Sequence, residues 1–278
     1  MHPSCLSHES RPGGGPDRVE SRVVTHAPPT TLLIIPAYNE GGRIGDVLRR
    51  VRAAGFVGEV VVIDDGSKDG TGAEAREAGA RVVQHPFNLG YGAALQTGYK
   101  AALDLGASYV VQMDADGQHE PDNIAKLLAP ILDDRCDVVI GSRFKDETGY
   151  QMGAIRSLGR KVFASIARLA GLRVSDPTSG FQAMNRHVLE LYAGDFFPAD
   201  YPDIDVLLTA FRHGMRVGEE SVQMSEGVRP STMHGGWGSF YYVYKMLLSI
   251  WAVSGSRRRE KPEPPATPLT PETKEDTP

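Results

Sequence analysis

The sequence predicts an α/β fold with a mostly parallel, doubly wound sheet that is flanked by helices. Short β-branched apolar runs alternate with helix-like stretches, as repeated β-α-β units require. The runs are apolar at successive positions, which is typical of strands covered by helices on both faces. Polar and acidic residues directly follow several of these runs. In such sheets ligands bind beyond the carboxyl ends of the strands, so these residues are the first candidates for a site.

Five apolar runs are expected to be strands, and four stretches between or after them are expected to be helices. The strands are expected at Leu32–Ile35, Val60–Ile63, Arg81–Val83, Tyr109–Met113 and Val138–Ile140. The helices are expected at Arg43–Ala54, Gly72–Ala78, Ala93–Leu105 and Asn123–Leu132. Pro121 precedes the last helix at a position where a first helical turn tolerates proline.

Both ends of the chain have a composition that predicts disorder. Residues 1–29 are rich in Gly, Pro and Ser, and residues 257–278 in Pro, Thr and acidic residues. Such segments bury too little apolar surface to offset the loss of chain entropy. We therefore expect one catalytic domain at residues 30–237, followed by an apolar helix at residues 238–256 and a disordered tail.

Composition excludes several classes of protein. The 278 residues carry a net charge of −5, which argues against a general nucleic-acid binder. Two cysteines, Cys5 and Cys136, give no disulfide framework and fit a reducing cytosol. The N-terminus lacks the apolar stretch of a signal peptide. No apolar run reaches the ~18 residues that would indicate a spanning helix.

Carboxylates gather where the fourth expected strand ends. In extended backbone, residues two apart point to the same side, so Asp114 and Asp116 can converge, and Gln118 can join them. Hard oxygen ligands of this kind suit Mg²⁺ or Mn²⁺, usually together with substrate phosphates. A bound cation would act as a Lewis acid toward a departing diphosphate. The histidines show no metal-ligand spacing and are given no role.

Two other phosphate-binding motifs are absent. The chain contains no Gly-x-x-x-x-Gly-Lys-Ser/Thr string, which disfavours a P-loop nucleotidase. Gly90-Tyr91-Gly92 is half of a dinucleotide fingerprint, but Leu95 stands where the third glycine belongs. We expect these glycines to let the backbone approach a ligand or the neighbouring sheet closely.

Six motifs in a fixed order carry a family resemblance. They are PAYNE at 36–40, DDGS-x-D-x-T at 64–71, N-x-G-x-G at 88–92, DADGQHEP at 114–121, GSRF at 141–144 and DPTSGFQAMNR at 176–186. The series resembles family 2 glycosyltransferases, and within them the branch of dolichol-phosphate mannosyltransferase and bacterial polyprenyl-phosphate glycosyltransferases. The resemblance covers nearly all of residues 31–232.

The resemblance implies a GT-A fold, a UDP- or GDP-sugar donor, and a role for each matching residue. The nucleotide would lie among Pro36, Tyr38, Glu40, Asp64 and Asp65. The metal (Mg²⁺ or Mn²⁺) and diphosphate would lie at Asp114, Asp116 and Gln118. The acceptor phosphate would be bound by Arg143, Arg156 and Arg229, and the transferred sugar would lie near Asp176 and Ser179. Arg229 stands in a loop that lacks the glycine and lysine of the family pattern.

The implied acceptor suggests a mechanism. A polyprenyl phosphate is largely dianionic near neutral pH, so it is already a nucleophile and needs no strong base. We therefore expect inversion by direct displacement, with Asp116, Asp176 and Arg143 as the catalytic residues. A glycan or small-molecule hydroxyl acceptor is the alternative, with Asp176 or Asp205 as its base. An inactive nucleotide-sugar-binding scaffold is a third reading.

The apolar segment at residues 240–254 reads FYYVYKMLLSIWAVS and is followed by Arg257-Arg258-Arg259. As a helix it would be roughly 20 Å long, which is shorter than a bilayer core of ~30 Å. Aromatic rings and a basic end fit a helix in the membrane interface, and burial against the domain or a partner is the alternative. We expect a cytoplasmic protein, peripheral at the inner face of the membrane, with any spanning anchor in a separate protein.

Overall fold

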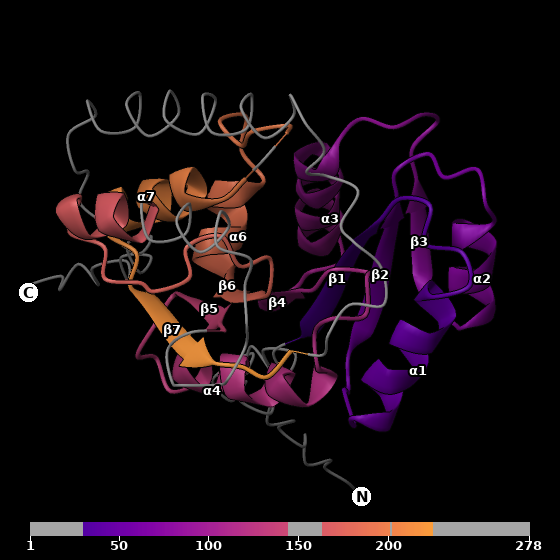
Figure 1. The fold of residues 1–278 in the computed structure, drawn as a ribbon, viewed down its shortest axis with the longest axis horizontal. Helices are drawn as coiled ribbons and strands as arrows, with labels where there is room; N and C mark the ends of the chain where they lie inside the picture. Colours follow the sequence, from indigo (N-terminus) through magenta and orange to yellow (C-terminus); the bar gives the residue numbers. More distant parts are fainter. Residues whose placement is uncertain (1–29, 144–162, 201, 225–278) are drawn as a thin grey trace, which may run out of the picture.

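The computed structural model describes residues 30–143, 163–200 and 202–224, which form a sheet between two layers of helices (Figure 1). Its described strands follow the order β3-β2-β1-β4-β6-β5-β7 across the sheet. Their bounds are β1 Thr31–Ala37, β2 Glu59–Asp64, β3 Arg81–Gln84, β4 Tyr109–Gln112, β5 Val138–Ser142, β6 Gln182–Asn185 and β7 Val217–Ser221. All five expected strands are present, with ends shifted by one or two residues.

The helices cover the two faces of the sheet, and each face has its own apolar core. The helices are α1 Ile44–Ala53, α2 Thr71–Glu77, α3 Tyr91–Asp104, η1 Pro121–Asn123, α4 Ile124–Leu132, α6 Arg186–Tyr192 and α7 Ile204–Arg212. One core joins α1, α2 and α4 to the sheet, and the other joins α3, α6, α7 and residues 163–172 to its opposite face. The four expected helices are confirmed, and Pro121 opens the short turn before α4.

Strand pairing is parallel except at β6. β1 pairs in parallel with β2 and β4, and β5 pairs in parallel with β7. β6 lies between β4 and β5 and is antiparallel to both. The sheet is therefore mixed but mostly parallel, as expected. The sequence does not predict β6 and β7, because Gln-Ala-Met-Asn and Val-Gly-Glu-Glu-Ser lack an apolar β-branched run.

The direction of chain progression reverses between β1 and β4. After β1 the chain moves outward through β2 to β3, and α3 then returns it to β4 on the other side of β1. Ligands of open α/β sheets bind at such a switch point, beyond the carboxyl ends of the strands. The loops that follow β1 and β4 flank this point, and they carry Glu40 and Asp114–Asp116.

Several expectations fall outside the described residues. The predicted disordered segments 1–29 and 257–278, the apolar helix 238–256, and the phosphate ligands Arg156 and Arg229 belong to this group. The domain limits 30–237 therefore stay a prediction. Within residues 30–143, 163–200 and 202–224, no helix has the length and apolar character needed to cross a membrane.

Candidate functional site

The loops after β1 and β2 are joined by hydrogen bonds. The backbone N–H of Asn39 donates to Ser67 Oγ (3.0 Å), and Asn39 Oδ1 accepts from the backbone N–H of Lys68 (3.0 Å). The backbone N–H of Glu40 donates to Thr71 Oγ1 (2.9 Å). Polar residues of the loop after β2 thus fix the position of the loop after β1, which carries Glu40.

Asp64 and Asp65 organise backbone at the end of β2. Both are nearly inaccessible, at 1% and 3% exposure. Asp64 accepts from a backbone N–H three residues later (2.9 Å). Asp65 accepts from the backbone N–H groups of Leu89 (2.8 Å) and Gly90 (2.9 Å), and its Oδ1 lies 2.7 Å from His85 Nδ1. In the structure these carboxylates shape the loops around the site, with Asp65 holding the loop that enters α3.

Pro36 and Tyr38 lie on either side of the end of β1. Pro36 is buried within β1, in register with Ile63 of β2. Tyr38 is 45% exposed just beyond the strand. Of the two, Tyr38 has the aromatic surface that a ligand at this edge could contact.

Carboxylates crowd together beyond β1 and β4. Burial and the charge of Asp114 raise the pKa of Asp116, although the backbone N–H of Gln118 donates to its Oδ1 (2.9 Å). Burial also raises the pKa of Glu40; Arg43 opposes this effect, and the Asp116 and Asp114 charges add to it. Repulsion of this kind is relieved by a bound cation, so the side chains fit a divalent metal.

The geometry of this acidic loop differs from the expectation in one respect. β4 ends at Gln112, and Asp116 lies in a turn, so the pair does not continue an extended strand. Extended backbone was therefore the wrong reason for bringing Asp114 and Asp116 together. Among residues 30–143, 163–200 and 202–224, no three His, Cys, Asp or Glu side chains form a complete metal site. Substrate phosphates commonly supply the remaining ligands of such cations.

Asp114 is surrounded on three sides. Tyr91 Oη donates to its Oδ1 (2.7 Å), and His119 Nε2 lies 3.2 Å from its Oδ2. A Cβ on Gly180 would lie 2.8 Å from Oδ2, so any larger residue there would displace the carboxylate. Burial acts to raise the pKa of Asp114, but the bonds from His119 and Tyr91 and the Arg143 charge outweigh it and lower the pKa. Sequence reasoning gave Tyr91 and His119 no role. The Tyr91 contact is tertiary, whereas His119 follows Asp114 by five residues in the same loop, so its place in the DADGQHEP motif was the signal that could have found it.

Arg143 and Asp176 form a buried bidentate ion pair. Nε lies 2.7 Å from Oδ2 and Nη2 lies 2.8 Å from Oδ1. The Asp176 side chain is fully buried, and that of Arg143 is 16% exposed. Glu219 of β7 accepts from the backbone N–H groups of Ser175 (2.9 Å) and Asp176 (3.0 Å). The two residues that the resemblance placed on different substrates thus bind each other.

Ser179 and Asp205 both act locally in the structure. Ser179 is buried, and its Oγ accepts from the backbone N–H of Phe181 (3.3 Å), which shapes the turn that contains Gly180. Asp205 is 6% exposed and accepts from the backbone N–H of Val206 (2.9 Å) at the start of α7. An Asp205 carboxylate in this position stabilises a helix start.

The glycines at the start of α3 approach a neighbouring loop closely. A Cβ on Gly92 would collide with the carbonyl oxygen of Pro198 and lie 2.7 Å from the carbonyl carbon of Ala199. The backbone N–H of Gly92 donates to the Asp200 carbonyl (3.2 Å), and that of Ala93 to the Ala199 carbonyl (3.0 Å). Helix N-terminal donors that could bind phosphate are thereby occupied, which agrees with the rejected dinucleotide motif.

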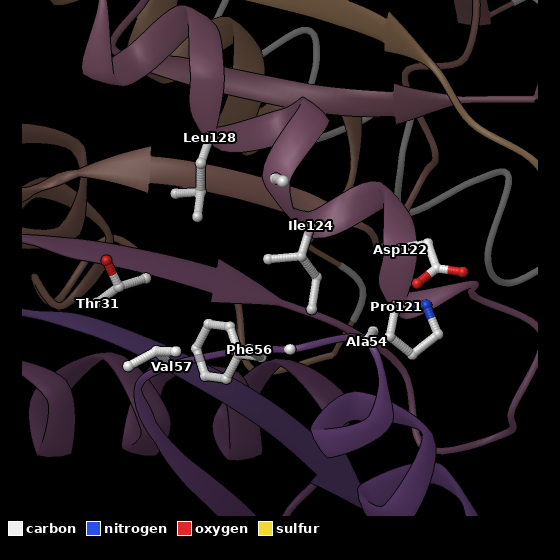
Figure 2. A pocket seen from close by; sticks show the side chains of 10 residues that line it. Thr31, Ala54, Phe56, Val57, Pro121, Asp122, Ile124 and Leu128 are labelled. Carbon is white, nitrogen blue, oxygen red and sulfur yellow. The ribbon is translucent and has the colours of Figure 1, made fainter.

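A separate cavity of about 200 Å³ lies between the loop after α1 and the start of α4 (Figure 2). Phe56 and Val57 line one side, and Ile124 and Leu128 line the other. None of the predicted site residues lines it. The polar edge beyond β1 and β4, rather than this cavity, therefore carries the candidate chemistry.

Comparisons with known proteins match this architecture. The model of the family described as "Glycosyl transferase family 2" matches residues 32–192. A UDP-N-acetylglucosamine–dolichyl-phosphate N-acetylglucosaminyltransferase of Methanococcus voltae is 31% identical, over 69% of this chain and 84% of the relative. A polyprenol monophosphomannose synthase of Mycolicibacterium smegmatis is 34% identical, over 70% of this chain and 77% of the relative.

Solved structures agree on the fold. Glucosyl-3-phosphoglycerate synthase from Mycobacterium tuberculosis, crystallised with Mn²⁺ and UDP-glucose, has a TM-score of 0.64 and 26% identity. The match covers 81% of this chain and 80% of that one. The fold is thus the GT-A type that the motifs implied.

Proposed function

The chain belongs to glycosyl transferase family 2, and from this premise we propose that it transfers a sugar from a UDP- or GDP-sugar to a polyprenyl phosphate. The names of the relatives from Methanococcus voltae and Mycolicibacterium smegmatis support a lipid-phosphate acceptor. One observation in the structure carries the proposal. Asp114, one of the carboxylates crowded at the switch point, lies within electrostatic reach of Arg143, whose charge lowers the pKa of Asp114.

Asp114 and Asp116 would hold Mg²⁺ or Mn²⁺, with Gln118 beside them. Their crowding supports this assignment, because burial and the charge of Asp114 together raise the pKa of Asp116. A structural neighbour crystallised with Mn²⁺ and UDP-glucose adds support. When bound, the cation would neutralise negative charge on the leaving diphosphate. Glu40 and Tyr38 would meet the nucleotide, and Asp64 and Asp65 would hold the loops around it.

Arg143 would bind the acceptor phosphate, and Asp176 would hold the guanidinium in position. The bidentate pair fixes the plane of the Arg143 side chain, and Glu219 fixes the backbone that carries Asp176. In this arrangement Asp176 is a positioning residue rather than a base, because its two oxygens are used by the ion pair.

The reaction we propose is an inverting displacement. An oxygen of the acceptor phosphate attacks the anomeric carbon while the bond to the diphosphate breaks, and the electron pair leaves with the nucleoside diphosphate. The phosphate dianion needs no proton removed, so orientation of the two substrates would supply much of the rate. Because the acceptor chain lies in the bilayer, we place the protein peripherally at the cytoplasmic membrane face, with a separate integral protein as partner.

The test incubates purified protein and Mn²⁺ or Mg²⁺ with polyprenyl phosphate and labelled UDP- and GDP-sugars. We expect label from one donor in the organic phase, and its loss in Asp116→Ala. Asp133→Ala is the matched control, because Asp133 is 63% exposed and lies outside the site. Donor hydrolysis without lipid labelling would indicate a hydroxyl acceptor instead. Neither transfer nor hydrolysis would favour an inactive binding scaffold.

A further inference from the structure

We propose that Tyr91 and His119 are positioning residues that fix the Asp114 carboxylate in the orientation needed to bind the metal and diphosphate of the donor. This inference rests on the proposed function, which assigns Asp114 to that site. Tyr91 comes from the first turn of α3, and His119 from the loop after β4. Neither residue would touch the substrate in this role, because each acts through Asp114.

Tyr91 and His119 each contact a different oxygen of the Asp114 carboxylate. Tyr91 Oη donates to Oδ1 at 2.7 Å, and His119 Nε2 lies 3.2 Å from Oδ2. A carboxylate only accepts hydrogen bonds, so this nitrogen carries the proton. Gly180 closes a third side, since a Cβ there would lie 2.8 Å from Oδ2 and 3.0 Å from Oδ1. The Asp114 side chain remains 30% exposed, so one side stays open to a ligand.

Tyr91 is itself held by a chain of buried polar groups. Gln112 Nε2 donates to Tyr91 Oη (3.3 Å), and Tyr99 Oη donates to Gln112 Oε1. Gln112 and Tyr99 are 2% and 1% exposed. Tyr91 and Tyr99 lie two turns apart on α3, so they project from the same helix face.

His119 is held by packing on one side. Its ring lies 4.8 Å from the ring of Phe181, and the residue is 4% exposed. Within the described part of the chain, Nδ1 has no hydrogen-bond partner. Among the described residues, the hydrogen bond from Nε2 to Asp114 is therefore the polar contact of the His119 ring. Carboxylates that bind metals are themselves held by hydrogen bonds, and the bond from His119 to Asp114 fits that role.

The experiment measures binding of Mn²⁺ with UDP or GDP by titration calorimetry, alongside the melting temperature. Tyr91→Phe and His119→Leu should each weaken binding roughly 10- to 100-fold, the usual effect of removing a partner of a metal ligand. His119→Gln, which can offer an N–H near the Nε2 position, should recover part of the affinity. Tyr192→Phe is the matched control, because it removes a buried hydroxyl that has no partner among the described residues.

Three outcomes would overturn the inference, and they differ in what else they reject. Wild-type affinity in Tyr91→Phe and His119→Leu, with binding lost in Asp114→Asn, would reject the inference alone. If Tyr91→Phe and His119→Leu weakened binding but also lowered the melting temperature much more than Tyr192→Phe does, the role of the two residues would be structural. No metal-dependent nucleotide binding by the wild-type protein would reject the proposed function and the inference together.

Discussion

Replacing Asp176 with asparagine should destabilise the fold far more than breaking an equally short ion pair on the surface. Asp176 and Arg143 meet through bonds of 2.7 and 2.8 Å, with side-chain exposures of 0% and 16%. Arg186 and Glu190 on α6 meet at 2.9 Å, but their exposures are 49% and 51%. The two pairs differ in burial and in the number of bonds, since the first pair is bidentate and the second makes a single bond.

Burial sets the expected magnitudes. Removing one partner of a buried pair leaves an uncompensated charge and costs about 3–5 kcal/mol. The partial exposure of Arg143 lets water approach the guanidinium, so we expect a loss near the lower end, about 3 kcal/mol. An exposed pair four residues apart on a helix contributes about 0.3–0.5 kcal/mol. Asp176→Asn should thus cost several times more than Glu190→Gln.

Urea unfolding of the two variants measures both free energies. A double-mutant cycle with Arg143→Met tests the pairing itself, because partners in contact are non-additive by about 0.5–3 kcal/mol. If Asp176→Asn lowered stability no more than Glu190→Gln, or if its effect simply added to that of Arg143→Met, the buried-pair reasoning would be refuted.

Two further predictions concern the acidic loop and the start of α3. The pKa of Asp116 is raised by burial and by Asp114, so the folded protein favours the protonated carboxyl. The contribution of Asp116 to the free energy of unfolding is therefore greatest at acidic pH and is lost as pH rises through the raised pKa. Asp116→Asn should therefore raise the melting temperature of metal-free protein at pH 7, measured in EDTA; a lower one would contradict the repulsion. Gly92→Ala should cost about 1–3 kcal/mol in urea unfolding, because its Cβ would collide with Pro198. Gly42→Ala, with a φ of 78° but no atom within 4 Å, should show backbone strain alone, and a cost equal to that of Gly92→Ala would argue against the collision.

The first half of the sheet could be predicted from the sequence because its strands are locally apolar. β6 could not, because Gln182 and Asn185 serve local bonds: Gln182 Nε2 donates to the Ser179 carbonyl, and Asn185 Oδ1 accepts from the Val188 N–H. In β7, Glu219 is used to hold the backbone of Ser175. Polar residues that make such hydrogen bonds interrupt the apolar run by which the other strands were identified.

The candidate site was predictable where it depends on strand ends and unpredictable where it depends on tertiary contacts. Asp114 and Asp116 follow β4, and the sheet rule identified them; Arg143 follows β5, and its role was implied by the family resemblance. The contact between Asp114 and Tyr91 joins the loop after β4 to the helix α3, which precedes β4 in the chain. The pairing of Arg143 with Asp176 likewise joins distant segments, and nothing in the local pattern of either indicates it.

The antiparallel strand β6 also decides when the site can first exist during synthesis. β4 and β5 are not neighbours, since each pairs with β6, which the ribosome makes after both. Until β6 inserts, the nascent sheet has a gap, and the Gly180 turn that lies against Asp114 is missing as well. Contacts this distant in sequence form late in folding. A chain that has been translated only as far as β5 therefore has no finished site at which to bind or hydrolyse a sugar donor.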